Sequence, residues 1–556
     1  MPVMQFTQVS VFDPQHISEA CLEEGTLPWF LARAGEWLIP RYLAAEWRGA
    51  GRMGRNAWPA RVHLSLCLLR TLDGGHSRKG ATRRARTDLA WRAAMGLSAG
   101  GKTPGEKSVR EFEAWLIERA EGSDVPRYEL FSEWIATAAL ASCATGERIW
   151  MMDSTPMFCF GALRGTVRLL GDGLRSLAKR FARWTGTNVV QLAKKLGIPW
   201  LKSKSTKGGL DIDWRDGDAR RKVVHQLATD VQTAIAHVLD HVIDVPLRHR
   251  ENLRGRCDAL LKVINDDLET DQDGNLVVAR RATSDRIVSI TDPDARSGRK
   301  SQQQPFKGFK LNLLGDLVSG VITAVKVVAG NVGDGGVGIE LLRSAKKLRL
   351  RMTKVFGDTA YGGVPTRLEA AMLGVEIVAP GVPIPSKGDV LQKHQFDIDF
   401  ENRVATCPAG VSTDEHDVVH KGDGPQDRYS WPVTACASCP LRPKCVPSWK
   451  QTKNRGRPRR FGKRLLLHPH EDVLRAARKK ASELDFKLQY RRRGEGERLV
   501  DRLTRRGARQ ANAFGLIAAN LQAHLTTMAA NLCLLAQACV DRGPPRTTLP
   551  LFGGSY

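Results

Sequence analysis

The order of apolar segments between residues 286 and 380 constrains the fold more than any other feature of the sequence. FKGFKLNLLGDL, GVITAVKVVAG and LRMTKVFGDTA are rich in Val, Leu and Ile and bounded by glycines, which is typical of buried strands. Helical segments, IELLRSAKKL and TRLEAAML, lie between the later strands, and GVEIVAP is the last strand expected. This mixed order predicts an α/β sheet, not a helical bundle or a β-sandwich.

The rest of the chain divides around this sheet, because 556 residues are too many for one ordinary core. ERIWMMDSTP predicts an earlier buried strand, and the cysteine-bearing region interrupts the sheet before the last helices. We expect a helical N-terminal domain at 1–147, the first core strand at 148–160, a helical insertion at 161–285, the remaining core strands at 286–395, a basic cysteine-bearing insertion at 396–470, closing helices at 471–545 and a tail at 546–556.

The charge balance indicates a polyanionic partner. Lys and Arg number 85 against 59 Asp and Glu, which gives a net charge of +26. Each phosphate that such a surface neutralises releases condensed counterions, so nucleic acid is favoured, with a membrane surface as the rival. The N-terminal MPVMQFTQVSVFDPQ lacks the basic and apolar regions of a secretory signal, so we expect a cytosolic protein.

The segment 511–540 has no Asp, Glu, Lys or Arg and is long enough to span a bilayer. Its polar residues would be costly in lipid; they are Asn512, Asn520, Gln522, His524 and Asn531. Its apolar positions recur at steps of three and four; they are Phe514, Ile517, Leu521, Leu525, Met528, Leu532 and Leu535. This spacing marks one face of a helix and predicts a buried core helix, not a membrane span.

Three acids fall where a metal-dependent site can form. Asp153 ends the first expected strand, Asp358 ends a later strand in KVFGDTAYGG, and a third acid lies in the helical stretch LQYRRRGEGERLVDRL. Acids at neighbouring strand ends, with one more from a flanking helix, can bracket two divalent cations that steady an in-line phosphoryl displacement. Magnesium suits such a site because it takes oxygen ligands and retains waters.

Helix geometry selects the third acid. At about 100° per residue, Tyr490, Arg493 and Glu497 share one face, whereas Glu495 falls some 140° from Tyr490. Glu497 is therefore the expected catalytic acid, and Asp501, one turn further on, is the alternative.

Two glycines, Gly494 and Gly496, interrupt the same helical stretch. Each weakens a helix by about 1 kcal/mol relative to alanine. Close approach of a DNA backbone is one explanation, and a frayed helix start is the other.

Together these motifs resemble the DDE transposases of bacterial insertion sequences. Tyr490-x2-Arg493-x3-Glu497 is similar to their last signature, and MMDSTP and FGDTAYGG look like their first and second Asp regions. Further similar segments are DRIVSITDPDARSGRKSQQQPFKGFKLNL and AGNVGDG, and the resemblance extends to the N-terminal helices and the cysteine-bearing insertion. One departure is that the basic residue often found seven places after the glutamate falls at Thr504, with Arg505 one place later.

The resemblance implies an RNase H-like core, with Asp153 on the first strand, Asp358 after the fourth and Glu497 on the closing helix. These acids would hold Mg²⁺ or Mn²⁺, while Tyr490 and Arg493 would contact transposon-end DNA. The implied reaction is phosphodiester cleavage at each element end, followed by attack of the released 3′-hydroxyl on target DNA.

The resemblance also implies the partners. They are double-stranded DNA, bound in part by the N-terminal domain, and a second copy of the chain in a dimer at the bacterial nucleoid. The alternatives are an RNase H-like nuclease without strand transfer and a catalytically inactive DNA-binding regulator.

Basic residues cluster ahead of the second core strand, in DPDARSGRKSQQQPFKGFK. They are Arg296, Arg299, Lys300, Lys307 and Lys310. Phosphate contacts near the scissile bond are expected, with a solvated basic loop as the alternative. Asp292 and Asp294 are candidates for the metal site or, more simply, for a turn around Pro293.

A second basic run, KNRGRPRRFGKR, contains Arg455 and Arg457 in an Arg-Gly-Arg-Pro pattern that resembles an AT-hook core. An extended Arg-Gly-Arg can enter a narrow A·T minor groove, and general phosphate binding is the alternative.

Four of the eleven cysteines, Cys407, Cys436, Cys439 and Cys445, cluster in the turn-rich insertion as CPAG, CASC and PLRPKC. A Cys-x2-Cys pair with two further cysteines fits a tetrahedral Zn²⁺ site that orders a segment with little core, as in a zinc ribbon. An iron–sulfur cluster or unligated thiols are the alternatives, and His416 and His420 are possible substitute ligands.

Overall fold

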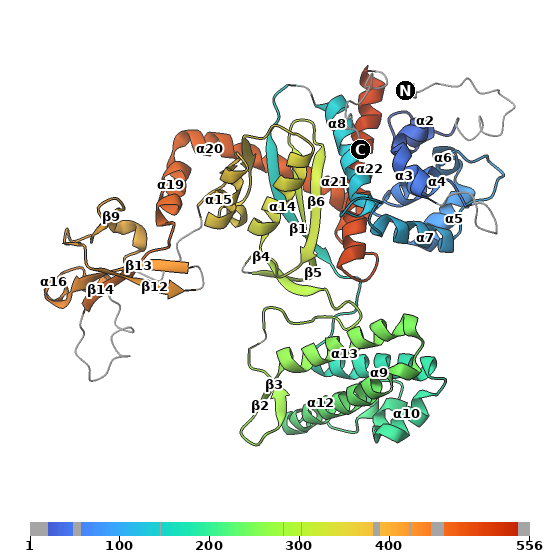
Figure 1. Ribbon diagram of the computed structural model, residues 1–556, viewed down its shortest axis with the longest axis horizontal. Coiled ribbons are helices and arrows are strands. Elements are labelled where there is room, and N and C mark those ends of the chain that lie inside the picture. Colours follow the sequence, from blue (N-terminus) through green and yellow to red (C-terminus); the bar gives the residue numbers. More distant parts are fainter. Residues whose placement is uncertain are drawn as a thin grey trace.

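The computed structural model describes residues 20–47, 57–144, 146–281, 283–301, 303–381, 390–421, 424–445 and 461–542. A central sheet is flanked by the N-terminal helices, by a second group of helices, and by a small module of short strands (Figure 1). Arg455 and Arg457, with the rest of their basic run up to residue 460, lie outside the described residues.

The central sheet is mixed and has six strands. They are β1 (Trp150–Phe158), β4 (Arg296–Ser301), β5 (Gln304–Asp316), β6 (Ile322–Ala329), β7 (Lys354–Phe356) and β8 (Glu376–Val378). β5 pairs antiparallel with both β1 and β6, whereas β7 runs parallel to β1 and β8 runs parallel to β7. This order, β6-β5-β1-β7-β8, is consistent with an RNase H-like core.

The basic residues expected just ahead of the second core strand lie on a β-hairpin, whereas a solvated basic loop had been the alternative. β4 pairs with the first half of β5, and β6 pairs with the second half. Arg299 and Lys300 lie on β4, and Lys307 and Lys310 lie on β5 itself. The strand period of two therefore determines which way these cations face.

Asp153 lies inside β1 and not at its end, because β5 continues to pair with β1 as far as Phe158. On the other side, β7 stops pairing where Phe356 stands opposite Met151. Two residues beyond that pair, the chain reaches Asp153 on β1 and Asp358 after β7. Asp153 therefore lies where the parallel strands β1 and β7 separate. The expectation that Asp153 ends its strand was correct for the pairing with β7 and wrong for the pairing with β5.

The long helix α22 (Leu516–Arg542) packs along β6 and against α8 (Arg127–Cys143) (Figure 1). Asn520 bonds both backbone groups of Val327, through Oδ1 at 2.9 Å and Nδ2 at 2.9 Å. Asn531 does the same at Ile322, at 3.0 and 2.8 Å. These two side chains satisfy edge groups of β6 that a further strand would otherwise bond.

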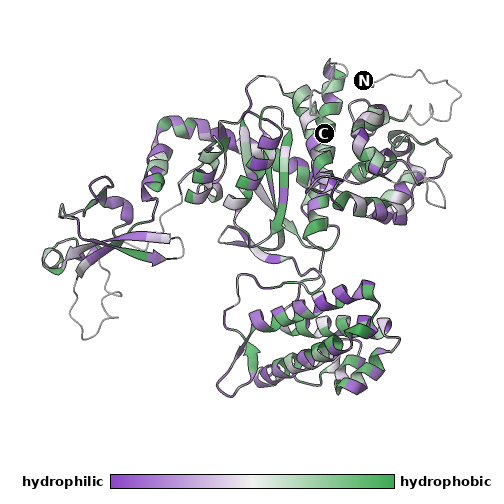
Figure 2. Ribbon diagram, in the orientation of Figure 1, coloured by the Kyte–Doolittle hydropathy of each residue, from purple (hydrophilic) through white to green (hydrophobic). Residues whose placement is uncertain are grey.

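By length and composition alone, Leu516–Asp541 could cross a membrane, but 72% of its most apolar window is buried within the protein. The helix is largely hydrophobic along its course (Figure 2). Leu521, Leu525 and Met528 are buried as expected, but Phe514 and Ile517 are 52% and 61% exposed. The expected apolar face therefore begins too early, because the helix starts at Leu516 and its first turn projects beyond the sheet.

The N-terminal helices share one apolar core with α8, α22 and one face of the sheet. They are α2 (Leu27–Ala34), α3 (Arg41–Glu46), α4 (Ala60–Leu69), α5 (Arg78–Thr87), α6 (Leu89–Ala94) and α7 (Glu106–Ile117). Packing of α2, α4 and α7 against α22 ties this region to the sheet.

The second group of helices has a separate apolar core. Its elements are α9 (Thr166–Trp184), α10 (Val189–Leu196), α11 (Thr206–Gly209), α12 (Gly217–Asp240), α13 (Leu247–Asp267) and the hairpin of β2 (Leu268–Thr270) and β3 (Leu276–Val278). It lies beside the N-terminal half of β5 in Figure 1.

The cysteine-bearing module contains more regular structure than its turn-rich sequence indicated. One three-stranded sheet is built from β9 (Asp397–Asp399), β10 (Val404–Thr406) and β11 (Ser412–Thr413). A second is built from β12 (His416–Lys421), β13 (Gly424–Pro432) and β14 (Phe461–Leu466). Two short helices, α16 (Val433–Ala437) and α17 (Arg442–Cys445), complete it. β9, β10 and β11 escaped detection because two or three residues are too few to show an alternating pattern.

The closing stretch is not the single α-helix that we expected. α19 (Glu471–Ser482) and α20 (Leu484–Tyr490) are followed by a 3-10 segment, Arg491–Gly496, and then by α21 (Glu497–Leu503). Close packing accounts for the glycine at its end, since a Cβ on Gly496 would lie 1.9 Å from Met151 Sδ on β1. Neither a nearby DNA backbone nor a frayed end is needed to explain this glycine. At Gly494 a Cβ would meet nothing within 4 Å.

A candidate active site between the parallel strands

The contact between Gly496 and Met151 brings the closing helices to the middle of the sheet. Met151 and Asp153 are two residues apart on β1 and so face the same side. Because Gly496 covers Met151, the residues around it reach the neighbouring Asp153. The Nη2 atom of Arg493 lies 3.6 Å from Asp153 Oδ1, and Glu497 begins α21.

Asp153 is largely shielded from solvent, with a side chain that is 14% exposed. Burial raises the pKa of its carboxyl group, and the negative charges of Asp358 and Asp334 act in the same direction. A hydrogen bond from the Ser154 N–H, at 2.8 Å, and the nearby Arg493 oppose that shift. A buried acid among other acids is stabilised by a cation, which is what a divalent metal ion would supply.

Asp358 follows β7 and caps a short 3-10 turn, accepting a hydrogen bond from the Ala360 N–H at 2.9 Å. Two tyrosines hold this turn. The hydroxyl of Tyr490 donates to the Gly357 carbonyl at 3.1 Å, and the fully buried Tyr361 donates to Asn312 Oδ1 at 3.1 Å. Tyr490 is half-buried, so the contact seen in the structure is with the loop before Asp358.

Asp153, Asp358 and Glu497 line one open cavity of about 1010 Å³. The acidic residues around it are Asp153, Asp334, Asp358, Glu497 and Asp501, and the basic ones are Arg299, Lys300, Lys310, Arg493, Arg498 and Arg509. In the part of the chain that the structure describes, no three His, Cys, Asp or Glu side chains are already drawn together as a metal site. The acids therefore face a shared space in which oxygen ligands are available to a hard cation.

The other two acids of the closing stretch are engaged by neighbours. Glu495 accepts a hydrogen bond from Arg498 at 2.9 Å and lies outside the cavity lining. Asp501 lines the cavity but lies 2.6 Å from Arg505. Glu497 is exposed at the cavity wall.

Asp334 is a fourth acid at this site, and the sequence analysis missed it. It begins α14 (Asp334–Lys347) and is 9% exposed. Lys310 Nζ lies 2.9 Å from its Oδ1, and the Ser154 hydroxyl donates to its Oδ2 at 3.3 Å. The available signal was AGNVGDG, a segment noted only for its similarity to the transposase family, in which this acid stands at a helix start.

The expected DNA-contacting cations separate into two groups. Arg299, Lys300 and Lys310 line the cavity together with Arg493. Lys307 is exposed on β5 outside that lining, and Arg296 is held 2.7 Å from Asp285.

Asp292 and Asp294 serve a helix end and lie outside the cavity lining. Asp292 accepts from the Gly515 N–H at 3.0 Å, and Asp294 accepts from the Leu516 N–H at 2.9 Å. Both thus satisfy donors at the start of α22.

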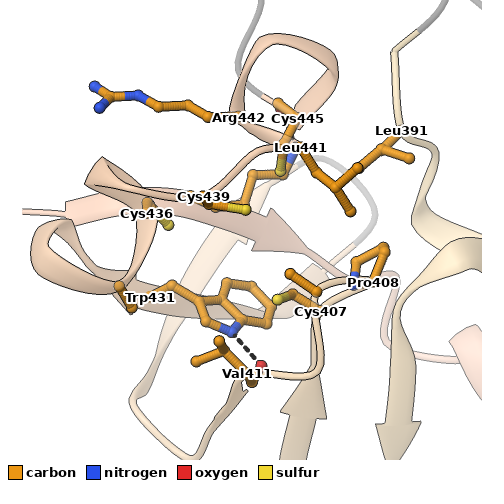
Figure 3. A pocket seen from close by; sticks show the side chains of 13 residues that line it. Leu391, Cys407, Pro408, Val411, Trp431, Cys436, Cys439, Leu441, Arg442 and Cys445 are labelled. Atoms are coloured by element: carbon orange, nitrogen blue, oxygen red, sulfur yellow. Dashed lines mark hydrogen bonds between the residues drawn. The ribbon is translucent and has the colours of Figure 1, made fainter.

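Cys407, Cys436, Cys439 and Cys445 line a separate small pocket in the cysteine-bearing module (Figure 3). His416 and His420 lie on β12, outside the residues that line this pocket.

The mixed sheet and its acidic, cation-flanked cavity are consistent with a protein of the nuclease and transposase class. A family model described as a transposase DDE domain matches residues 406–536. This match supports the assignment of the chain as a DDE transposase, a family that typically uses a divalent metal ion and acts on DNA. The matched segment includes Glu497 but neither Asp153 nor Asp358. Comparisons with curated proteins and with solved structures gave no match.

Proposed function

We propose that this protein cleaves DNA at the ends of a bacterial insertion sequence and joins the released 3′-hydroxyl to target DNA. The supporting observation is the single cavity lined by Asp153, Asp358 and Glu497, which come from three distant parts of the chain. Hydrolysis breaks one phosphodiester with water, and the joining step exchanges one phosphodiester for another. No external energy source is therefore needed.

Asp153, Asp358 and Glu497 would hold Mg²⁺ or Mn²⁺, since carboxylate oxygens suit these cations and the burial of Asp153 favours a positive neighbour. When bound, the ions supply Lewis acidity at the scissile phosphate. The turn at Asp358 is held by the hydrogen bond from the Ala360 N–H to Asp358 and by the hydrogen bond from the Tyr490 hydroxyl to the Gly357 carbonyl. The packing of Gly496 against Met151 holds the start of α21. Protein contacts thus orient Asp153 and Asp358, while the exposed Glu497 is placed at the cavity wall by its helix.

The cations around the cavity would bind the DNA backbone. Arg299 and Lys300 are exposed on β4 at the cavity wall, so both are accessible to phosphates. Arg493 lies 3.6 Å from Asp153 and is partly exposed, so it would contact the phosphate next to the cleaved bond. Lys310 is already paired with Asp334, so its role is to position that acid. A homodimer would pair two element ends.

The test uses purified protein, Mg²⁺, linear DNA with the element ends, and a plasmid target. Joined products are expected from the wild type. Glu497→Gln should reduce cleavage by at least about 10²-fold, which is the scale of losing one electrostatic stabiliser, while DNA binding is retained. Glu495→Gln is the matched control and should cleave normally. Cleavage without joining would indicate a nuclease, binding alone would indicate a regulator, and full activity of Glu497→Gln would refute the assignment of that acid.

A further inference from the structure

Four cysteines from separate segments converge on one small pocket. Cys407 follows β10, Cys436 lies in α16, Cys439 lies just beyond α16, and Cys445 ends α17. Their sulfur atoms turn toward the same space, as Figure 3 shows, and that space measures about 30 Å³. A volume of this size is enough for one water molecule or one metal ion.

The backbone around this pocket brings the cysteine-bearing segments close to one another. The Cys407 N–H donates to the Val411 carbonyl at 2.9 Å, and the Gly410 N–H donates to the Cys407 carbonyl at 2.8 Å. Gly410 has a φ of +81°, which glycine adopts without strain. A Cβ on Gly462 of β14 would lie 2.5 Å from Cys436 Sγ, so only glycine lets β14 pass this thiol.

The module has little apolar packing with which to hold these segments. Its buried apolar residues are Phe396, Ile398, Ala405, Tyr429, Trp431, Leu465 and Leu467. Trp431 donates to the Val411 carbonyl at 2.9 Å, which fastens one side of the pocket. Two three-stranded sheets on so small a core require an additional cross-link, since small domains commonly depend on metals or disulfides.

The side chains available at the pocket favour zinc over other cross-links. Two residues separate Cys436 from Cys439, a spacing typical of structural zinc sites. Lys463 Nζ lies 2.8 Å from the Cys445 carbonyl, which brings a positive charge to the pocket wall. Four thiolates around Zn²⁺ carry a net charge of −2, and this ammonium group would offset part of it.

We propose that Cys407, Cys436, Cys439 and Cys445 bind one structural zinc ion, which fastens α16 and α17 to the strand β10. Each thiol loses its proton to solvent on binding, and no electron is transferred. Within the described residues the thiols are not yet gathered at ligand spacing, so they would close on the ion by side-chain rotation. This site is separate from the acidic cavity and does not depend on the proposed DNA chemistry.

The first test is metal analysis of the full-length protein, purified without a metal-binding tag. One zinc ion per chain is expected in the wild type and in Cys21→Ser, whose exposed thiol lies outside the pocket. Cys436→Ser should lose the zinc. Absence of zinc from the wild type, bound iron with sulfide, or full zinc retention in Cys436→Ser would each overturn the proposal.

The second test avoids variants that fail to fold. Wild-type protein is stripped of metal and reloaded with Co²⁺, which should give the thiolate charge-transfer and visible bands of a tetrahedral cobalt site. Hydrogen exchange should then show lost protection in the strands β9 to β14 of the stripped protein, with β1 and β5 unchanged. Absence of the cobalt spectrum, or an exchange pattern unaffected by metal removal, would contradict the zinc site.

Discussion

The acidic cavity and the cysteine pocket are both assembled from distant segments, but very different amounts of packing support them. Met151 and Leu313 beside the cavity belong to an extended apolar cluster and are fully buried. The cysteine pocket rests on seven buried apolar residues. Packing therefore fixes the strands and helix that carry the carboxylates before any ion arrives, whereas the cysteine-bearing segments need their ion to complete the module.

The largest expected effect separates function from stability at the cavity. Asp153→Asn should lower cleavage by at least about 10²-fold, because one ligand charge is lost. Its melting temperature should stay the same or rise, because burial already disfavours the charged carboxylate. Cleavage assays and calorimetry give the two values. A melting temperature that falls as far in Asp153→Asn as in Cys445→Ser would remove the distinction between the two regions.

A variant of Asp334 tests whether cleavage depends on a residue that contacts Lys310 and Ser154 at the cavity wall. Asp334→Asn removes the negative partner of Lys310, so cleavage should fall by about 10- to 100-fold, as for other residues that orient ligands. The matched control is Glu340→Gln, on the same helix but paired with Lys326 at the surface. Measuring cleavage against Mg²⁺ concentration distinguishes positioning, which shifts the metal requirement, from a loss of folding. Unchanged activity in Asp334→Asn would mean that Asp334 only contributes its negative charge at the start of α14.

Alanine variants of Gly494 and Gly496 test whether packing against β1 positions the closing helices. Gly496→Ala would drive a methyl group into the buried Met151 and should destabilise the protein by about 1–3 kcal/mol while lowering cleavage. Gly494→Ala places its methyl in open space and should stabilise the helix by up to about 1 kcal/mol. Urea unfolding measures both changes. If the two variants behave alike, contact with Met151 does not set the helix position.

The smallest expected effect concerns acid stability of the packed region. His524 on α22 lies with its ring 4.8 Å from Tyr128, and complete burial lowers its pKa to about 3. The unfolded state, with a pKa near 6.5, binds this proton first, so the stability contribution is full above pH 6.5 and is lost as the pH falls toward 3. Between pH 6.5 and 5.5 the loss is about 1 kcal/mol.

His524→Leu should remove that part of the pH dependence. Urea unfolding of the wild type and the variant at both pH values, followed at α22 by hydrogen exchange, tests this expectation. If the unfolding free energy of the variant changes with pH as much as that of the wild type, other groups cause the acid sensitivity. Among these are the cysteine thiols, which release zinc when protonated.

Local sequence patterns predicted much of the central fold. Buried strands, the apolar run of α22 and the order of the three acids all follow from periodicity and spacing along short stretches. The strand β4 was missed because its sequence, RSGRKS, has no apolar residue, and β9 to β11 were missed because they have two or three residues each. The reason for the glycine at 496 was missed because its neighbour, Met151, lies on another element.

The sequence alone determined the residue types: three acids in order, a Cys-x2-Cys pair with two more cysteines, and an excess of cations over the whole chain. Only the tertiary structure decided that Asp334 joins the cavity, that Tyr490 holds the Asp358 turn, and that Asn520 and Asn531 bond the edge of β6. The physical reason is distance along the chain. Periodicity reports the neighbours of a residue within a turn or a strand, whereas these contacts join segments that meet only when the sheet and its helices pack together.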